Sequence, residues 1–166
     1  VLNLTPNNIG TRTFTINNTG GIVSNGTTNF DKDDNVTLTG SSSFTNAGTF
    51  NHSHFGTNDN LVVKGGLTFT NSGDYLLTNG GDIQITGAGS TFNNSGLLHK
   101  SGPNDAALFD FSASTTGTFN NLAGGEVRST GGILHVAARG TNTSVAGATW
   151  TANGGEIRLG AEWTGT

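Results

Sequence analysis

An aromatic residue recurs along this chain between small polar residues, and asparagine and glycine follow it closely. The six copies are Thr13-Phe14-Thr15, Ser43-Phe44-Thr45, Thr68-Phe69-Thr70, Thr91-Phe92-Asn93, Thr118-Phe119-Asn120 and Thr149-Trp150-Thr151. Successive aromatics are 30, 25, 23, 27 and 31 residues apart. A period in this range, with the same residue type at the same point of each unit, is typical of a solenoid whose units stack on one another.

The composition favours an all-β chain. Only 32% of the 166 residues are hydrophobic and 11% are charged, and Gly, Thr, Asn and Ser make up much of the rest. Thr, Val, Ile and Phe favour strands, whereas Gly and Asn favour turns that need left-handed backbone. The residues that form helices most readily are too sparse for a long helix.

Each repeat contains three short extended stretches, and side chains alternate between the two faces of such a stretch. In the first stretch the recurring aromatic points inward. The second follows a glycine, and its inward residues are Val23, Phe50, Tyr75, Leu98, Val127 and Ile157. The third has the form apolar-x-apolar, in the pairs Leu2/Leu4, Val36/Leu38, Leu61/Val63, Ile83/Ile85, Phe109/Phe111 and Leu134/Val136. The recurring Asn after the aromatic predicts a ladder of side-chain amides at the turn.

Three strands per repeat, with equivalent positions aligned, predict a right-handed parallel β-helix (β-solenoid) of about six coils, each with three short strands. The hand follows from the rule for parallel crossovers. We expect residues 1–166 to form one domain. An antiparallel β-sandwich is the competing fold, but it does not require the same residue at the same offset in every unit. Because both ends of the chain fall within a coil, we expect either a segment of a longer solenoid or copies that stack end to end.

Charge and cysteine content exclude several classes of function. The net charge is −4 and the pI about 5.3, and no basic stripe points to nucleic acid. No apolar run is long enough to cross a membrane, so we expect no membrane insertion in this segment. The chain has no cysteine, which removes disulfides and thiolate chemistry. We expect no cofactor.

The Thr-aromatic-Thr motif predicts two outward ranks of hydroxyl groups on one side of the solenoid. One rank would hold Thr13, Ser43, Thr68, Thr91, Thr118 and Thr149, and the other Thr15, Thr45, Thr70, Asn93, Asn120 and Thr151. The threonines of these ranks are the candidate binding residues. Such ranks resemble the Thr-x-Thr arrays of β-solenoid ice-binding proteins, and a glycan is the other ligand class considered. Alternatively, Thr is here simply a good outward strand residue.

Two clusters are candidates for a metal. Asp31, Asp33 and Asp34 form the only acidic cluster and are a candidate Ca²⁺ site, although Lys32 lies among them and no bidentate Glu completes the set. A polar loop is the alternative. His52 and His54 lie on one side of a stretch, where they are either the start of a metal site or, for His52 beside Phe50, part of the core.

Charged residues elsewhere give little support to catalysis. Glu126 and Glu156 occupy one outward position and Arg128 and Arg158 another, which predicts a small patch with pairs between coils. The remaining acids are spread along the chain at Asp59, Asp74, Asp82, Asp105, Asp110 and Glu162. A polysaccharide-active enzyme, a class that parallel β-helices include, would need such acids gathered on one face. We therefore expect a protein that is not an enzyme.

The repeated Thr-Phe-x-Asn-x-Gly, followed by Gly-x-apolar and apolar-x-apolar, resembles the β-helical repeats of large secreted bacterial surface proteins. These are the filamentous haemagglutinin-like adhesins and autotransporter passenger domains. The resemblance implies an extracellular or cell-surface location in a bacterium, and a role in attachment, matrix building or filament formation. It also implies other copies of the chain and surface glycans as partners. It carries over no catalytic residue.

Overall fold

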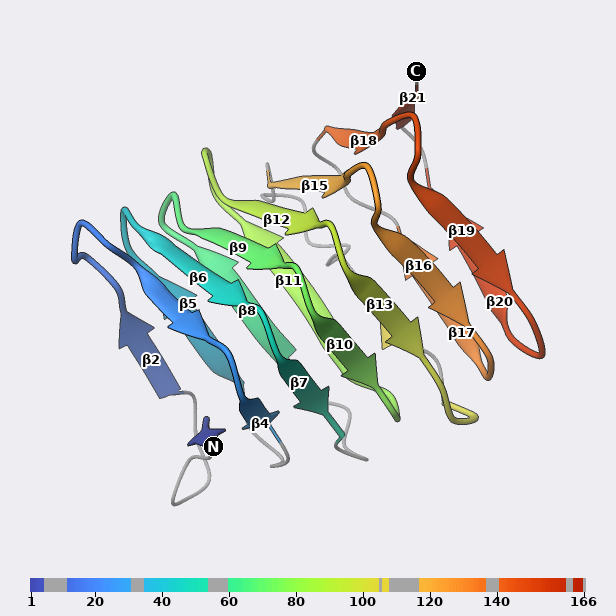
Figure 1. Ribbon diagram of the computed structural model, residues 1–166, viewed down its shortest axis with the longest axis horizontal. Coiled ribbons are helices and arrows are strands. Elements are labelled where there is room, and N and C mark those ends of the chain that lie inside the picture. The colour runs from blue at the N-terminus through green and yellow to red at the C-terminus, as the bar shows by residue number, and fades with distance from the viewer. Residues whose placement is uncertain are drawn as a thin grey trace.

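The chain folds into a parallel β-solenoid in the computed structural model (Figure 1). The structure describes residues 1–4, 12–30, 35–53, 60–104, 106–107, 117–136, 141–160 and 163–165, with the backbone alone at 106–107 and 164–165. Each strand pairs in parallel with strands one coil earlier or later. The described residues contain strands and turns and no helix.

Three sides enclose the core. The front sheet contains β1 (Leu2–Asn3), β4 (Thr27–Phe30), β7 (Thr49–His52), β10 (Asp74–Leu77), β13 (Leu97–Lys100), β16 (Glu126–Ser129) and β19 (Thr149–Ala152). The aromatic sheet contains β3 (Ile22–Ser24), β6 (Ser43–Asn46), β9 (Thr68–Asn71), β12 (Thr91–Asn94), β15 (Thr118–Asn121), β18 (Asn142–Ser144) and β21 (Trp163–Gly165). The rear side has two sheets, one of β2 (Arg12–Thr15), β5 (Val36–Thr39), β8 (Asn60–Lys64) and β11 (Asp82–Thr86), the other of β14 (Ala106–Ala107), β17 (Ile133–Val136) and β20 (Glu156–Leu159).

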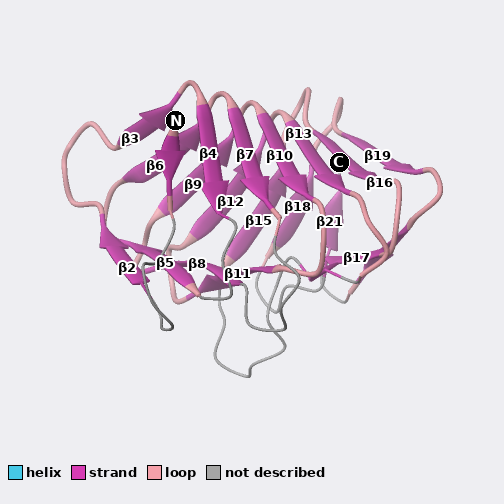
Figure 2. Cartoon of the chain, turned by 90° about the horizontal axis from the view of Figure 1, so that it is seen from below, coloured by secondary structure: helices cyan, strands magenta, loops and turns pink. Residues whose placement is uncertain are grey.

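The chain visits the front sheet, the rear side and the aromatic sheet in a fixed order. In Figure 1 the front strands descend toward the right, and the chain returns behind them before it enters the aromatic sheet above, which is the expected right-handed winding. Figure 2 shows β5, β8, β11 and β17 in one row along the rear side. The solenoid has about five turns, slightly fewer than the six coils expected.

The predicted column of rings fills the middle of the solenoid. Phe44, Phe69, Phe92 and Phe119 pair in register and are buried. Ring centroids along this column lie 5.2, 4.8 and 5.9 Å apart. A second column begins in the front sheet, where the Phe50 and Tyr75 rings stack at 4.7 Å. Burial of each such side chain contributes about 1.5–3 kcal/mol.

Inside the first turn after the aromatic, asparagines form the predicted amide ladder. Asn46 Nδ2 donates to Asn71 Oδ1 at 2.8 Å, Asn71 to Asn94 at 2.8 Å, and Asn94 to Asn121 at 2.9 Å. The same Nδ2 atoms also donate to backbone carbonyls of the next coil, such as Leu97 O at 2.9 Å from Asn71. All four asparagines are fully buried, so the ladder satisfies polar groups that would otherwise destabilise the core.

The glycines after this ladder are required by packing between coils. A Cβ at Gly48, Gly73 or Gly96 would overlap backbone atoms of the preceding coil, including the carbonyl oxygen of the glycine there. None of these three is among the described glycines with positive φ. The expected reason, left-handed backbone, was therefore wrong at these positions, although it holds at Gly124 and Gly154.

The first and last copies of the aromatic motif lie on other sides than predicted. Phe14 belongs to the rear side and pairs with Leu38, while Trp150 belongs to the front sheet and pairs with Val127. Alternation of polar and apolar residues suits all three sides, so the motif alone does not fix the side.

The spacing between successive coils explains why these two copies of the motif lie on other sides. The residues that align with the Phe column are Ile22 before it, and Asn142 and Trp163 after it. Aligned residues in neighbouring strands of this sheet are therefore 22, 25, 23, 27, 23 and 21 residues apart. The two outer steps of 30 and 31 residues were too long for a single coil.

The same shift changes two of the predicted inward sets. Val23 points outward, because Ile22 is opposite Phe44, and the second-stretch equivalent in this coil is Thr28, opposite Phe50. Ile157 lies on the rear side opposite Leu134, and Leu2 lies in the front sheet. The third-stretch residues of the middle coils, from Val36 to Ile85, are buried as expected. Phe109 and Phe111 lie outside the described residues.

We predict that Phe69→Ala lowers the free energy of unfolding by about 3–5 kcal/mol, because it opens a cavity between two stacked rings. Phe14→Ala should cost much less, because Phe14 is 38% exposed at the end of the solenoid. Urea denaturation of both variants measures the difference. Equal losses would contradict the register described here.

We predict that Ser24→Asn extends the ladder by one step and stabilises the chain by about 1 kcal/mol. Ser24 lies opposite Asn46, whose buried Oδ1 has no hydrogen-bond partner. The new amide would lose the contact of Ser24 Oγ with Thr28 Oγ1 but would donate to Asn46. Ser24→Ala is the control, and a Tm for Ser24→Asn no higher than that of Ser24→Ala would refute the prediction.

Candidate binding surface

The outer side of the aromatic sheet carries two rows of small polar side chains, which we call the hydroxyl-amide face. Register places Ser43, Thr68, Thr91 and Thr118 in one row, and Thr45, Thr70, Asn93, Asn120 and Thr143 in the other. Neighbours in a row are about 4.8 Å apart, and the rows about 6.6 Å, because strand and pleat spacing fix both distances. The result is a regular array of donors and acceptors.

Five of the nine predicted binding residues lie on this face, namely Thr45, Thr68, Thr70, Thr91 and Thr118. The other four do not. Thr13 and Thr15 pair with Thr37 and Thr39 on the rear side. Thr149 and Thr151 pair with Glu126 and Arg128 in the front sheet.

Thr143 belongs to the face and was not predicted. It lies in β18, where Asn142 takes the place of the aromatic, so the aromatic motif does not mark this strand. Asn142, Thr143 and Ser144 are all polar, so no alternation marks this strand; the one signal was its distance of 23 residues from Phe119, which equals a coil length.

Hydrogen bonds orient part of the second row. Asn120 Nδ2 donates to Asn93 Oδ1 at 2.8 Å, and Thr143 Oγ1 donates to Asn120 Oδ1 at 2.5 Å. These bonds join successive coils along the solenoid axis. An array of this kind can form many shallow contacts with a repeating ligand, because each coil presents small hydroxyl or amide groups at the same two positions.

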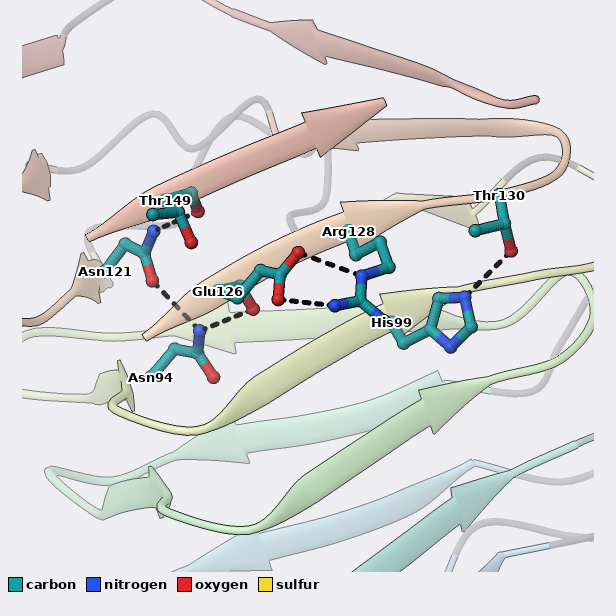
Figure 3. Close-up of polar contacts among 7 residues, drawn as sticks. All are labelled: Asn94, His99, Asn121, Glu126, Arg128, Thr130 and Thr149. Carbon is teal, nitrogen blue, oxygen red and sulfur yellow. Dashed lines mark hydrogen bonds and ion pairs between the residues drawn. The ribbon is translucent and has the colours of Figure 1, made fainter. Parts of the chain in front are cut away.

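The front sheet carries a charged group, drawn in Figure 3. Arg128 Nε donates to Glu126 Oε1 at 2.9 Å, and Arg128 Nη2 to Glu126 Oε2 at 2.7 Å. Arg128 lowers the pKa of Glu126, chiefly through these hydrogen bonds. Both side chains are partly exposed, so the pair contributes little to stability.

The predicted pairing between coils was wrong. Glu126 pairs with Arg128 two residues along the same strand, and Glu156 pairs with Arg158 in the same way in β20. Since β16 is in the front sheet and β20 on the rear side, the two pairs do not form one patch.

His99 adjoins the first of these pairs, and its Nε2 lies 2.8 Å from Thr130 Oγ1 (Figure 3). Burial is the main cause that lowers the His99 pKa, and the charge of Arg128 lowers it further. The imidazole therefore stays neutral to lower pH than an ordinary histidine does.

His52 belongs to the core, which was the second of the two interpretations of this residue. Its Nδ1 lies 3.0 Å from the Tyr75 hydroxyl, and its ring lies 4.6 Å from that of Phe30. His54, Asp31, Asp33 and Asp34 lie outside the described residues. Within the part of the chain that is described, no three His, Cys, Asp or Glu side chains form a group that could hold a metal ion.

The acids considered for catalysis do not come together where they are described. Asp74 is exposed in the front sheet, whereas Asp82 is on the rear side. Asp59, Asp105, Asp110 and Glu162 lie outside the described residues. The hydroxyl-amide face contains no acid among its named residues.

Lys100 is a buried charge that the sequence did not indicate. Lys100 occupies an inward position in β13, opposite Leu77 of β10. Its Nζ donates to the carbonyls of Ser101 at 2.8 Å and Gly102 at 3.1 Å. A third contact, 3.4 Å, reaches Gly131 O in the next coil. Lys100 thus ties two successive turns together.

The described ranges contain no helix with the length and apolar character that a transmembrane span requires. No protein-family model matches the chain. No curated protein and no solved structure matches it either.

We predict that an NMR titration of His99 has a midpoint below about 6.5, the ordinary value for histidine. Because the pKa of His99 is lower in the folded state than in the unfolded state, the unfolded chain binds the proton more readily. The free energy of unfolding therefore falls as the pH drops from the unfolded pKa to the folded pKa of His99. Arg128→Gln should raise the midpoint, because it removes a positive charge near the ring. A midpoint at or above that of a histidine in a short peptide would contradict the description.

Proposed function

We propose that this chain is an extracellular structural and adhesive β-solenoid, which holds the hydroxyl-amide face out as a shallow, multivalent binding surface. The observation that carries the proposal is the in-register repetition of Ser, Thr and Asn on the outer side of the aromatic sheet. A rigid core behind that side keeps the rows in fixed positions. No catalytic group is needed for such a role.

The chemistry of the face favours a neutral glycan as the ligand. Hydroxyl and amide groups both donate and accept hydrogen bonds, as sugar hydroxyls do. The named residues of the face carry no charge, which gives an acidic polymer no ionic partner there. Each contact is weak, so affinity would arise from many coils binding one polymer at the same time.

The resemblance to haemagglutinin-like and autotransporter repeats supports the proposed location at a bacterial cell surface. An all-β chain without cysteine can reach its stability through repetition alone, since each coil adds its own stacking contacts. In the proposed role, the packed core makes the solenoid stiff, and the outer rows make the contacts with the ligand.

We predict that Thr68→Val with Thr91→Val weakens binding to long neutral glycans at least about tenfold, which corresponds to the loss of about 1.4 kcal/mol. Valine keeps the shape and strand preference of threonine but removes its hydroxyl. A glycan array followed by titration with short and long oligosaccharides measures the effect, and affinity should rise with oligosaccharide length.

The matched control is Thr49→Val on the outer side of the front sheet, which should leave glycan binding unchanged. Absence of binding to every neutral glycan would refute the proposed ligand class. Thermal hysteresis measured on the same samples tests ice as the alternative repeating ligand, and hysteresis lost in the double variant would assign the face to ice instead.

A further inference from the structure

The polar groups of the hydroxyl-amide face differ in whether the protein already uses them. Asn120 Nδ2 donates to Asn93 Oδ1, and Thr143 Oγ1 donates to Asn120 Oδ1, so these groups are partly occupied within their own row. The hydroxyls that β6, β9, β12 and β15 contribute to the face have no hydrogen-bond partner within the described part of the chain. They belong to Ser43, Thr45, Thr68, Thr70, Thr91 and Thr118, all of them partly exposed. A ligand can therefore bind them without breaking a contact inside the protein.

These hydroxyls form one continuous block. The strands β6, β9 and β12 are successive neighbours in the aromatic sheet, as Figure 1 shows. Register puts Thr70 next to Thr45 in one row, and Thr68 next to Thr91 in the other. The block is thus two rows wide and continues from coil to coil.

A sugar can bind a protein through its C–H faces or through its hydroxyl-bearing edges, and this face suits the second mode. Stacking on a C–H face requires an exposed aromatic ring, but Phe44, Phe69 and Phe92 are buried on the inner side of the same strands. The outward positions of these strands hold Ser, Thr and Asn, which donate and accept hydrogen bonds. A bound sugar therefore turns an edge toward the sheet.

Repetition on the face runs along the solenoid axis and not across it. Successive coils repeat the pair of outward groups about every 4.8 Å. Across the axis, a strand of four residues such as β9 offers only two outward groups within about 13 Å. A polymer that lies along the axis meets a new pair of groups at every coil, whereas a polymer that lies across it soon leaves the face.

The length of the repeating unit decides which polymer stays in step with the coils. Pyranose rings joined through equatorial bonds form an extended ribbon, in which each sugar is only slightly longer than the strand spacing of about 4.8 Å. The hydroxyls of such a ribbon lie along its edges. Rings joined through an axial bond form a coiled chain that advances much less per sugar, so its hydroxyls lose register with the rows within a few coils.

We propose that the ligand of the hydroxyl-amide face is an extended, equatorially linked neutral polysaccharide that lies along the solenoid axis. One hydroxyl edge of the ribbon lies between the two rows, with about one sugar for each coil. This inference rests on the proposed function of the face as a glycan-binding surface, and it adds the linkage of the glycan and its direction.

Cello-oligosaccharides and malto-oligosaccharides test the linkage, because both consist of glucose alone and differ only in whether the bond between units is equatorial or axial. Titration calorimetry of the full chain should give an affinity for cellopentaose at least about tenfold higher than for maltopentaose. Affinity should also rise from cellobiose to cellopentaose, because each added glucose reaches the groups of one more coil.

Backbone amide shifts in NMR spectra test the direction. Cellopentaose along the axis should perturb Thr45, Thr70 and Asn93 together, since these residues lie on three successive strands of one row. Thr70→Val should weaken cellopentaose binding about threefold, because one hydrogen bond contributes modestly in water. Thr49→Val in the front sheet is again the control and should leave the affinity unchanged.

The possible failures of this inference and of the proposed function are distinguishable. Equal affinities for the two series would overturn the linkage, and shifts confined to one strand would overturn the direction, while glycan binding itself would stand. Binding of some other neutral glycan without binding of cellopentaose would likewise overturn this inference alone. Absence of binding to every neutral glycan would overturn both.

Discussion

Parallel stacking of coils in register is the constraint on which every other feature of this molecule depends. It places each inward side chain directly above and below its counterparts, so one residue type repeated at one offset produces a continuous column. The rings of Phe44, Phe69 and Phe92 show the consequence, since neighbouring pairs stack at 5.2 and 4.8 Å. Rings from the front sheet meet this column edge to face, as between Phe50 and Phe69, and join two sides of the solenoid.

The same register lets polar residues enter the core. A buried asparagine finds an acceptor in the asparagine of the next coil, as Asn71 does in Asn94. Lys100 Nζ donates to turn carbonyls, and His52 Nδ1 lies within hydrogen-bond distance of the Tyr75 hydroxyl. Each is partnered through the repetition or through a turn that the repetition places nearby. A chain with only 32% hydrophobic residues can therefore fill its interior without leaving most of these groups unpaired.

The sequence predicts the middle coils well, because four inward positions per coil are apolar, one in each of the first two stretches and two in the third, and the glycines mark the turns. Its limits lie at the ends. Phe14 and Trp150 repeat the motif but lie on other sides, since local alternation does not specify which of three sides a strand joins. The outward face was accordingly only half predicted: Thr68 and Thr91 lie on it, whereas Thr149 does not. Lys100 was not foreseen, because its partners are backbone carbonyls, two in the turn that follows it and one, Gly131 O, in the next coil, and residue types do not indicate these.

One strand register aligns both the inward rings and the outward rows of the hydroxyl-amide face, so the register of the aromatic column is the most direct test. Nuclear Overhauser effects should connect the ring protons of Phe69 with those of both Phe44 and Phe92, and backbone contacts between β6, β9 and β12 should follow the parallel pattern. Rings without mutual contacts, or the close Hα–Hα contacts of antiparallel strands, would contradict the structure and the functions inferred from it.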